Sequence, residues 1–110
     1  MAELGAPALM GKATYHLHPD DTDAFKAIVA RMAADGSRSP GCLFLHAAQD
    51  AGDPTTFYLF EGWDNDESVA AFNSSDGFQA ALSDAMALRM TGRGGQRYVV
   101  SGVEDMTMPS

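Results

Sequence analysis

The sequence has a single cysteine, Cys42, so it cannot form an internal disulfide or a cysteine-based metal cluster. It has no apolar run close to the ~20 residues that span a membrane. Residues 1–11 also lack the basic and apolar regions of a signal peptide. These absences predict a protein of the reducing cytoplasm that has no membrane partner.

Basic residues are scarce, since seven Lys and Arg stand against fifteen Asp and Glu, for a formal net charge of −8. A chain with this charge repels nucleic acid and anionic membranes, so we expect neither as a partner. The 110 residues are enough for one domain that buries about two-thirds of its unfolded surface. We therefore expect a single domain over residues 1–110, with its core at about 8–103 and a short tail at each end.

The most informative stretch is residues 55–63, which is apolar and aromatic and contains one carboxylate. In a β-strand, successive side chains alternate between the two faces. One face then carries Phe57, Leu59, Glu61 and Trp63, and the other carries Thr56, Tyr58, Phe60 and Gly62. Neither set is typical of a surface in contact with water, so both faces need cover. We expect the chain's own helices on one face and a second copy of the same sheet on the other.

Hydrophobic periodicity and turn residues divide the rest of the chain. They predict further strands at 8–17, 42–49 and 97–103, and helices at about 24–36, around 69–72 and at 78–90. The polar connection 50–54 predicts a hairpin, whereas the glycine-rich segment 90–96 is predicted to be a loop. The order strand, helix, strand, strand, helix, strand is that of the split βαβ arrangement. It predicts an α+β, ferredoxin-like fold: a four-stranded antiparallel sheet with its helices on one face.

Several short motifs follow one another in an order similar to that of a known family. They are Ser39-Pro40-Gly41-Cys42, the turn residues Asp53-Pro54, the strand from Phe57 to Glu61-Gly62-Trp63, and Ser75-Asp76-Gly77-Phe78. Over about residues 8–103 the chain resembles the antibiotic biosynthesis monooxygenase family. The resemblance implies a dimeric α+β barrel, in which two protomers pack through the helix-free faces of their sheets. Members of the family include cofactor-independent monooxygenases of phenols and quinols, and haem-degrading enzymes.

Trp63 and Glu61 are the first candidates for a site, because they share one face of the predicted strand 55–63. The resemblance implies that Trp63 lines a pocket between sheet and helices; the alternative is a core aromatic that closes the end of the sheet. Burial beside aromatics would raise the pKa of Glu61 and make it a base toward a phenol. The alternative for Glu61 is an ion pair with Arg97 or a hydrogen bond at the dimer interface.

The three histidines are His16, His18 and His46. Three imidazole nitrogens can bind a metal ion, but His-x-His with one distant His is a common chance pattern, so no metal site is predicted. We expect instead that His16 or His46 acts singly as a proton shuttle. Three arginines, at positions 89, 93 and 97, bracket the glycine-rich segment. They can hold a substrate carboxylate or phenolate, or else cap a helix and pair with surface acids.

The substrate pocket is predicted to be lined by Tyr58, Leu59, Phe72, Phe78, Leu82 and Met86. Many members of the family have a histidine where this chain has Phe72, so the resemblance implies a more apolar pocket with one base fewer. The position of the proximal haem ligand in the haem-degrading members falls at Leu82, which cannot bind iron. The polar strand residue of the polyketide-tailoring members falls at Leu59. No cofactor is therefore predicted.

Together these observations predict a cofactor-independent monooxygenase that oxidises a small aromatic phenol, anthrone or quinol with O₂. Two alternatives stay open. One is a non-catalytic dimeric barrel that binds a small hydrophobic ligand, and the other is a haem-degrading monooxygenase. The expected partners are a small aromatic molecule and a second copy of the chain.

Overall fold

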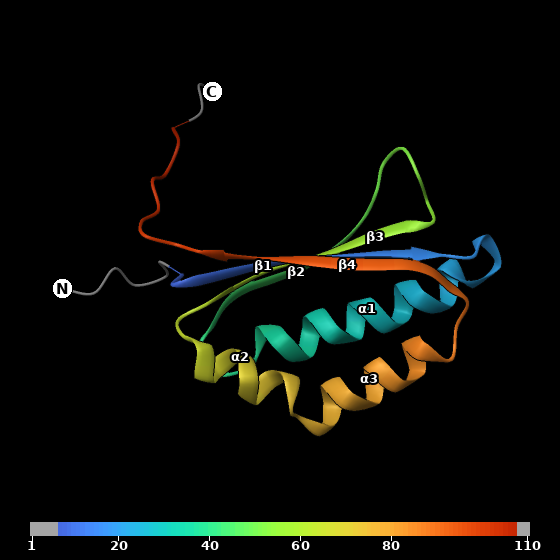
Figure 1. Ribbon diagram of the computed structural model, residues 1–110, viewed down its shortest axis with the longest axis horizontal. Helices are drawn as coiled ribbons and strands as arrows, with labels where there is room; N and C mark the ends of the chain where they lie inside the picture. The colour runs from blue at the N-terminus through green and yellow to red at the C-terminus, as the bar shows by residue number, and fades with distance from the viewer. Residues whose placement is uncertain (1–6, 108–110) are drawn as a thin grey trace.

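The computed structural model describes residues 7–107, so residues 1–6 and 108–110 of the predicted tails lie outside the described residues. In chain order the elements are β1 (Leu9–Leu17), the 3₁₀ turn η1 (Pro19–Asp21), α1 (Thr22–Ser37), β2 (Cys42–Gln49), β3 (Thr56–Trp63), α2 (Asp66–Asn73), α3 (Asp76–Met86) and β4 (Met90–Val99). The strands form one antiparallel sheet in the order β2-β3-β1-β4. The helices of residues 7–107 cover one face of this sheet (Figure 1). The predicted α+β, ferredoxin-like fold is confirmed.

The last strand differs from its prediction. The glycine-rich segment 90–96 is not a loop but the first part of β4, which ends at Val99 and not at residue 103. Three of its glycines pair with β1 in an antiparallel ladder, opposite Ala13, Thr14 and His16. Glycine weakens a strand, but the ladder itself needs only backbone groups. β4 is an edge strand, and most of its residues are exposed and show no apolar alternation.

The core lies between the sheet and the helices. Its centre is Phe25 of α1, whose ring centroid lies 5.1 Å from that of Phe57 on β3 and 5.2 Å from that of Tyr15 on β1. Edge-to-face and tilted contacts at this distance are favourable for aromatic pairs. Full burial of each large apolar side chain contributes about 1.5–3 kcal/mol to folding. The predicted helical stripe of α1 is therefore the one that packs on the sheet: Phe25, Ile28, Val29 and Met32 are buried.

Local side-chain chemistry sets the ends of the shorter elements. The side chain of Asn65 accepts a hydrogen bond from the N–H of Ser68 at the start of α2, and Ser75 accepts one from the N–H of Phe78 in α3. Both bonds satisfy backbone donors that the first turn of a helix leaves unpaired. Gly41 before β2 has φ of +82°, and a Cβ there would lie 2.1 Å from Oγ of Ser68. This turn therefore needs glycine.

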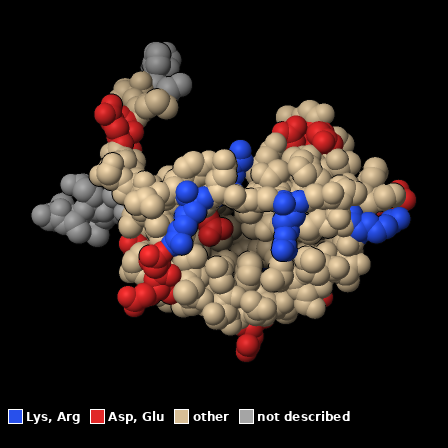
Figure 2. Space-filling view, viewed as in Figure 1, with Lys and Arg blue, Asp and Glu red and all other residues tan. Residues whose placement is uncertain are grey.

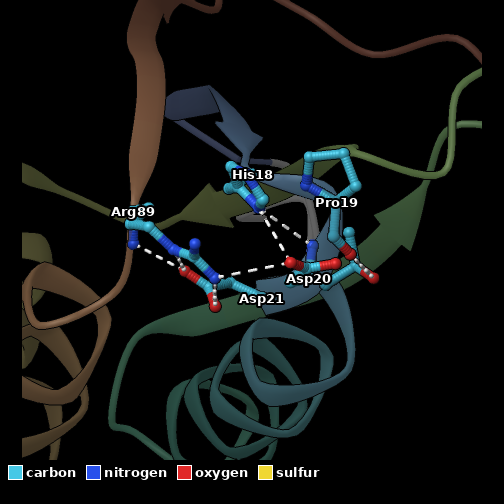
Figure 3. A network of polar contacts seen from close by, with 6 residues as sticks. His18, Pro19, Asp20, Asp21 and Arg89 are labelled. Carbon is cyan, nitrogen blue, oxygen red and sulfur yellow. Dashed lines mark hydrogen bonds and ion pairs between the residues drawn. The ribbon is translucent and has the colours of Figure 1, made fainter.

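An ion pair joins the start of α1 to the start of β4 (Figure 3). The Arg89 guanidinium donates to both carboxylate oxygens of Asp21, with distances of 3.0 and 3.1 Å, and the backbone N–H of Arg89 donates at 2.8 Å. The N–H of His18 also donates to the carbonyl of Arg89 at 2.8 Å. These bonds stabilise the charged carboxylate and lower the pKa of Asp21 from 3.8 to about 2. The contacts fix where β4 enters the sheet.

Replacing Arg89 with glutamine is expected to raise the pKa of Asp21 toward 3.8, but not fully, since the backbone N–H at position 89 still donates. A depressed carboxyl pKa stabilises the fold above the unfolded pKa, and that stability is lost as the pH falls from about 4 to about 2. The stability difference between wild type and Arg89→Gln should therefore shrink over this window. NMR titration of the Asp21 carboxyl and acid unfolding curves measure both effects.

Arg31→Gln is the control for that measurement, since Arg31 pairs with Asp84 and not with Asp21. An unchanged Asp21 pKa in Arg89→Gln would contradict the assignment of the shift to the guanidinium.

Candidate functional site

The sheet register separates the sequence-predicted site residues into two groups. Residues that face each other across an antiparallel ladder point to the same side of the sheet. Glu61 pairs with Gly11, on the side that the helices cover. Tyr58 pairs with Thr14 and Ala48 and lies three positions before Glu61, an odd number, so it points to the helix-free face. His16 and His46 share that helix-free face. The structure does not bring these three residues to Glu61 and Trp63.

Trp63 and Glu61 form a hydrogen-bonded pair. Nε1 of Trp63 donates to Oε1 of Glu61 at 2.9 Å. The indole itself is only 1% exposed, and its centroid lies 5.4 Å from that of Phe72. A buried indole N–H needs an acceptor, and Glu61 is that acceptor. Trp63 is thus a core aromatic that orients the carboxylate, and it offers little open surface to a substrate.

The Glu61 carboxylate lies beside a hollow between the sheet and α2, which we call the Glu61 cleft. One part has a volume of about 250 Å³ and is lined by Leu9, Met10, Gly11, Glu61, Trp63, Val69, Asn73 and Arg97. A neighbouring part of about 310 Å³ is lined by Gly11, Lys12, Ala13, Glu61, Gly95, Gln96 and Arg97. The two parts share Gly11, Glu61 and Arg97. Figure 2 shows a hollow on this side of the molecule, with acidic atoms inside it and basic side chains at its borders.

Small residues form the floor of the Glu61 cleft. Gly11 and Ala13 are alternate residues of β1, and Gly95 of β4 pairs with Ala13. All three therefore lie on the helix-covered side of the sheet. A Cβ at Gly11 would lie 3.0 Å from Cγ of Glu61, so the glycine lets the Glu61 side chain lie flat across β1. A small residue at each of these positions leaves the volume that larger side chains would fill. The cleft is therefore a consequence of the sequence Gly11-Lys12-Ala13 and of Gly95.

Tyr15 also belongs to this side, although the sequence did not single it out. Its register partner on β4 is Arg93, and its ring packs on Phe25. Burial raises the pKa of the Tyr15 hydroxyl, the negative charge of Glu61 raises it further, and Arg93 opposes the rise. The charges of Glu61 and Arg93 therefore both reach the Tyr15 hydroxyl. The alternation of side chains along β1 puts Tyr15 on the same face as Gly11, and this pattern could have identified Tyr15 from the sequence.

Two of the three candidate arginines are engaged in ion pairs. Arg97 pairs with Asp66 at the start of α2, and not with Glu61 as the alternative interpretation supposed. It nevertheless lines the Glu61 cleft. Arg89 binds Asp21 at the far end of β4. Arg93 lies between them, and its Nη1 is 3.5 Å from Sδ of Met86 on α3. Arg97 thus lines the cleft, and Arg93 lies four residues earlier on the same side of β4.

The other predicted pocket residues contribute mainly to the core. Leu59 and Phe72 are buried, and Phe78 and Leu82 pack against the core. Met86 is 54% exposed at the end of α3. Phe72 also borders a separate hollow of about 370 Å³ between α2 and the turn before β2, whose lining includes Pro40 and Glu67.

The helix-free face holds the remaining candidates. The Tyr58 hydroxyl donates to Asp50 at 2.8 Å, and the His46 ring stacks 5.7 Å from Phe44. His16 is tied to the β2–β3 turn, since its Nδ1 lies 2.9 Å from Oγ1 of Thr56. Thr56 gives its only hydroxyl proton to Asp53, so Nδ1 of His16 is the donor in that bond.

Among residues 7–107, no three His, Cys, Asp or Glu side chains lie close enough together to hold a metal ion. In the same part of the chain, no helix has the length and apolar character to cross a membrane.

The sequence profile described as antibiotic biosynthesis monooxygenase matches residues 10–83. A solved protein of Deinococcus radiodurans with this description is similar in fold (17% identity, TM-score 0.84, 91% of this chain and 99% of that one covered). One of Nitrosomonas europaea is also similar (22% identity, TM-score 0.80, 86% and 99% covered). So is SnoaB, a cofactor-independent oxygenase from Streptomyces nogalater solved as a point mutant (15% identity, TM-score 0.73, 86% and 94% covered). No curated protein matches the chain.

Proposed function

The chain belongs to the antibiotic biosynthesis monooxygenase family, and on that premise we propose that it is a cofactor-independent monooxygenase of a small aromatic phenol, anthrone or quinol. The observation that carries the proposal is the Glu61 carboxylate, which Trp63 holds at 2.9 Å beside a cleft with a floor of small residues. The description of SnoaB as a cofactor-independent oxygenase supports the proposal for a chain of the same fold.

The chemistry requires one base and a substrate that is itself the reductant. Glu61 takes a proton from the phenol or from the methylene group of an anthrone, and the resulting carbanion passes electrons to O₂. In the net reaction one oxygen atom enters the substrate, two hydrogens leave it, and these hydrogens and the second oxygen atom form water. The substrate supplies all four electrons, so the reaction balances without another reductant.

The site supports this role in two ways. The Trp63 N–H occupies Oε1 of Glu61 and fixes the carboxylate rotamer, so the second oxygen is the one free to accept a proton. Arg97, which lines the cleft, stabilises negative charge that develops on the substrate. A positioned general base of this kind contributes about 10²–10⁴-fold to a rate.

The proposal includes a partner, which is a second copy of the chain. The helix-free face of the sheet displays a group of partly exposed aromatic and apolar side chains: Met10, Phe44, Tyr58, Phe60 and Tyr98. Phe60 lies on a central strand and is 37% exposed. An apolar surface of this kind is usually covered in a soluble protein. We propose that two chains pack through this face as a homodimer with a twofold axis.

A non-catalytic binding role is the second candidate function, and one observation favours it. Neither His16 nor His46 lines the Glu61 cleft, because both point to the other face of the sheet. Within the described residues the cleft therefore offers one carboxylate and no imidazole for proton transfer. Such a cleft can bind a small hydrophobic ligand without turnover.

Oxygen uptake by the purified, metal-stripped protein tests the proposed function. The assay uses a panel of anthrones, quinols and polyphenols, and product masses are recorded in parallel. Uptake with a product that has gained one oxygen and lost two hydrogens would support the monooxygenase. Binding of panel compounds without uptake would contradict it and assign the protein to the binding role.

A substitution on the cleft floor tests whether the Glu61 cleft is the binding site. A Cβ at Gly95 would meet only the Lys12 carbonyl, at 3.4 Å, so Gly95→Val is expected to fold and to fill part of the cleft. The valine side chain takes up space that a ligand would occupy, so affinity for a bound panel compound should fall about tenfold, which is about 1.4 kcal/mol. Isothermal titration calorimetry measures it.

Gly94→Val is the matched control, since the adjacent residue lies on the helix-free face and a Cβ there meets nothing within 4 Å. Oligomeric state is measured for both variants. An equal loss of affinity in the two variants, or no loss in Gly95→Val, would place the binding site elsewhere.

A further inference from the structure

The arginines of this acidic protein differ in their partners. Within the described residues, four of them form ion pairs: Arg31 with Asp84, Arg38 with Asp35, Arg89 with Asp21 and Arg97 with Asp66. In that part of the chain, Arg93 has no carboxylate within 4.0 Å, and its guanidinium contacts the sulfur of Met86. Within residues 7–107, one guanidinium of this acidic protein thus has no carboxylate partner.

The backbone places Arg93 on the side of the sheet that holds the cleft, two positions before the lining residue Gly95 on β4. It lies on the helix-covered side of β4, opposite Tyr15, and it reaches across to Met86 at the end of α3. Its neighbours Gly92 and Gly94 have no side chains that would crowd the guanidinium. Along the same side of β4, Gly95 and Arg97 follow, and Arg97 is level with Gly11 and Glu61.

The distance between Arg93 and Glu61 suits a fused-ring aromatic molecule. Four residues of β-strand, from position 93 to position 97, span roughly 13 Å. Between these ends lie Ala13 and Gly95, whose small side chains leave room for a flat ring system. A molecule that lies along this floor places one end at Arg93 and the reacting end at Glu61.

From these observations we propose that the substrate is an aromatic carboxylic acid, and that Arg93 binds its carboxylate. The inference rests on the proposed function and specifies its substrate class. A carboxylate is favoured over other anionic groups because the planar guanidinium matches its two oxygens with two parallel hydrogen bonds. The Tyr15 hydroxyl lies on the same side of the sheet and can donate to the same group. The family match ends at residue 83, so Arg93 lies outside it.

Binding of paired ligands tests the proposal without requiring turnover. Aromatic carboxylates with one, two and three rings, such as 2-naphthoate, are compared by calorimetry with their neutral amides, such as 2-naphthamide. Wild type is expected to bind at least one carboxylate about tenfold more tightly than its amide. Arg93→Gln should abolish that preference, leaving amide affinity unchanged, because a hydrogen-bonded charge pair is lost. Arg93→Lys should restore only part of it, since an ammonium lacks the fork of the guanidinium.

Arg38→Gln is the control, because it removes the same charge from an exposed position whose partner is Asp35. It should leave the carboxylate preference unchanged, whereas a general effect of net charge would lower the preference equally in both variants and overturn the proposal. A wild-type protein that binds no carboxylate more tightly than its amide would also overturn it. So would a preference that survives in Arg93→Gln. Thermal melting confirms that each variant is folded.

The same experiments separate this inference from the proposed function. If carboxylates bind through Arg93 but no panel compound consumes oxygen, the proposed function fails and the Arg93 site stands. If neutral anthrones are oxidised at the same rate by wild type and by Arg93→Gln, and no carboxylate is preferred, the Arg93 site fails and the monooxygenase stands.

Discussion

Replacing Glu61 with glutamine is expected to lower oxygen uptake by about 10²–10⁴-fold, the usual contribution of a positioned general base. Glutamine has nearly the same shape, and its amide oxygen still accepts the hydrogen bond from Nε1 of Trp63. The substitution therefore removes the basic oxygen without leaving the buried indole unsatisfied. Stability should change little, and steady-state oxygen consumption with the best panel compound measures the loss.

Two further variants make the Glu61 experiment specific. Glu67→Gln removes the same charge from an exposed position on α2, beside the separate hollow that Pro40 also lines, and should keep full activity. Trp63→Phe keeps an aromatic ring but loses the N–H donor, so it should lower uptake only while Glu61 is present. The two losses should then not add in the double variant. Full uptake by Glu61→Gln would remove Glu61 from the chemistry.

The sequence predicted the central part of the fold because β3 carries a strong pattern. Alternating aromatic and apolar residues from Thr56 to Trp63 are typical of a strand that is covered on both faces, and the structure places this strand inside the sheet. The helical stripe of α1 and the hairpin between β2 and β3 are equally local signals. Each of these predictions needs only neighbouring residues, so each could be made from the chain alone.

β4 could not be predicted in the same way, because its glycines suggested a loop. Its stability comes from pairing with β1, about 80 residues earlier in the chain, and the sequence of β4 itself contains little trace of that pairing. Without the strand there is no register, and without the register Arg93 and Arg97 have no place beside Glu61. The loop prediction therefore concealed the floor residue Gly95, and it left the arginines that the sequence had singled out without a position relative to Glu61.

The separation of the histidines from Glu61 is also a matter of register. Alternation shows that His16 and Tyr15 point to opposite faces of β1, but it does not show which of them faces the helices. The pairing of Gly11 with Glu61 decides this, since it puts Tyr15 on the side of the cleft and His16 on the other. One step of register would exchange the two residues. A single sequence does not contain that information.

Replacing Phe60 with lysine is expected to weaken the proposed homodimer by about 100-fold or more. Phe60 is level with Lys12 on β1 and with His46 on β2, so the new ammonium would lie among cationic and aromatic groups. A charge buried in an interface without a partner costs several kcal/mol. Phe60→Asp should be less severe, because Lys12 is its cross-strand neighbour and can pair with the carboxylate. Sedimentation equilibrium measures both dissociation constants.

Ala80→Lys supplies the control, since it adds the same charge to an exposed position on α3, away from the sheet. It should remain as dimeric as wild type. Glu61 and Gly95 lie on the helix-covered side of the sheet, away from the proposed interface, so oxygen uptake per chain should persist in the Phe60→Lys monomer. A wild-type monomer, or a Phe60→Lys variant that still dimerises, would show that the helix-free face is not the interface. The aromatic side chains on that face would then require a different partner, because water is an unfavourable cover for them.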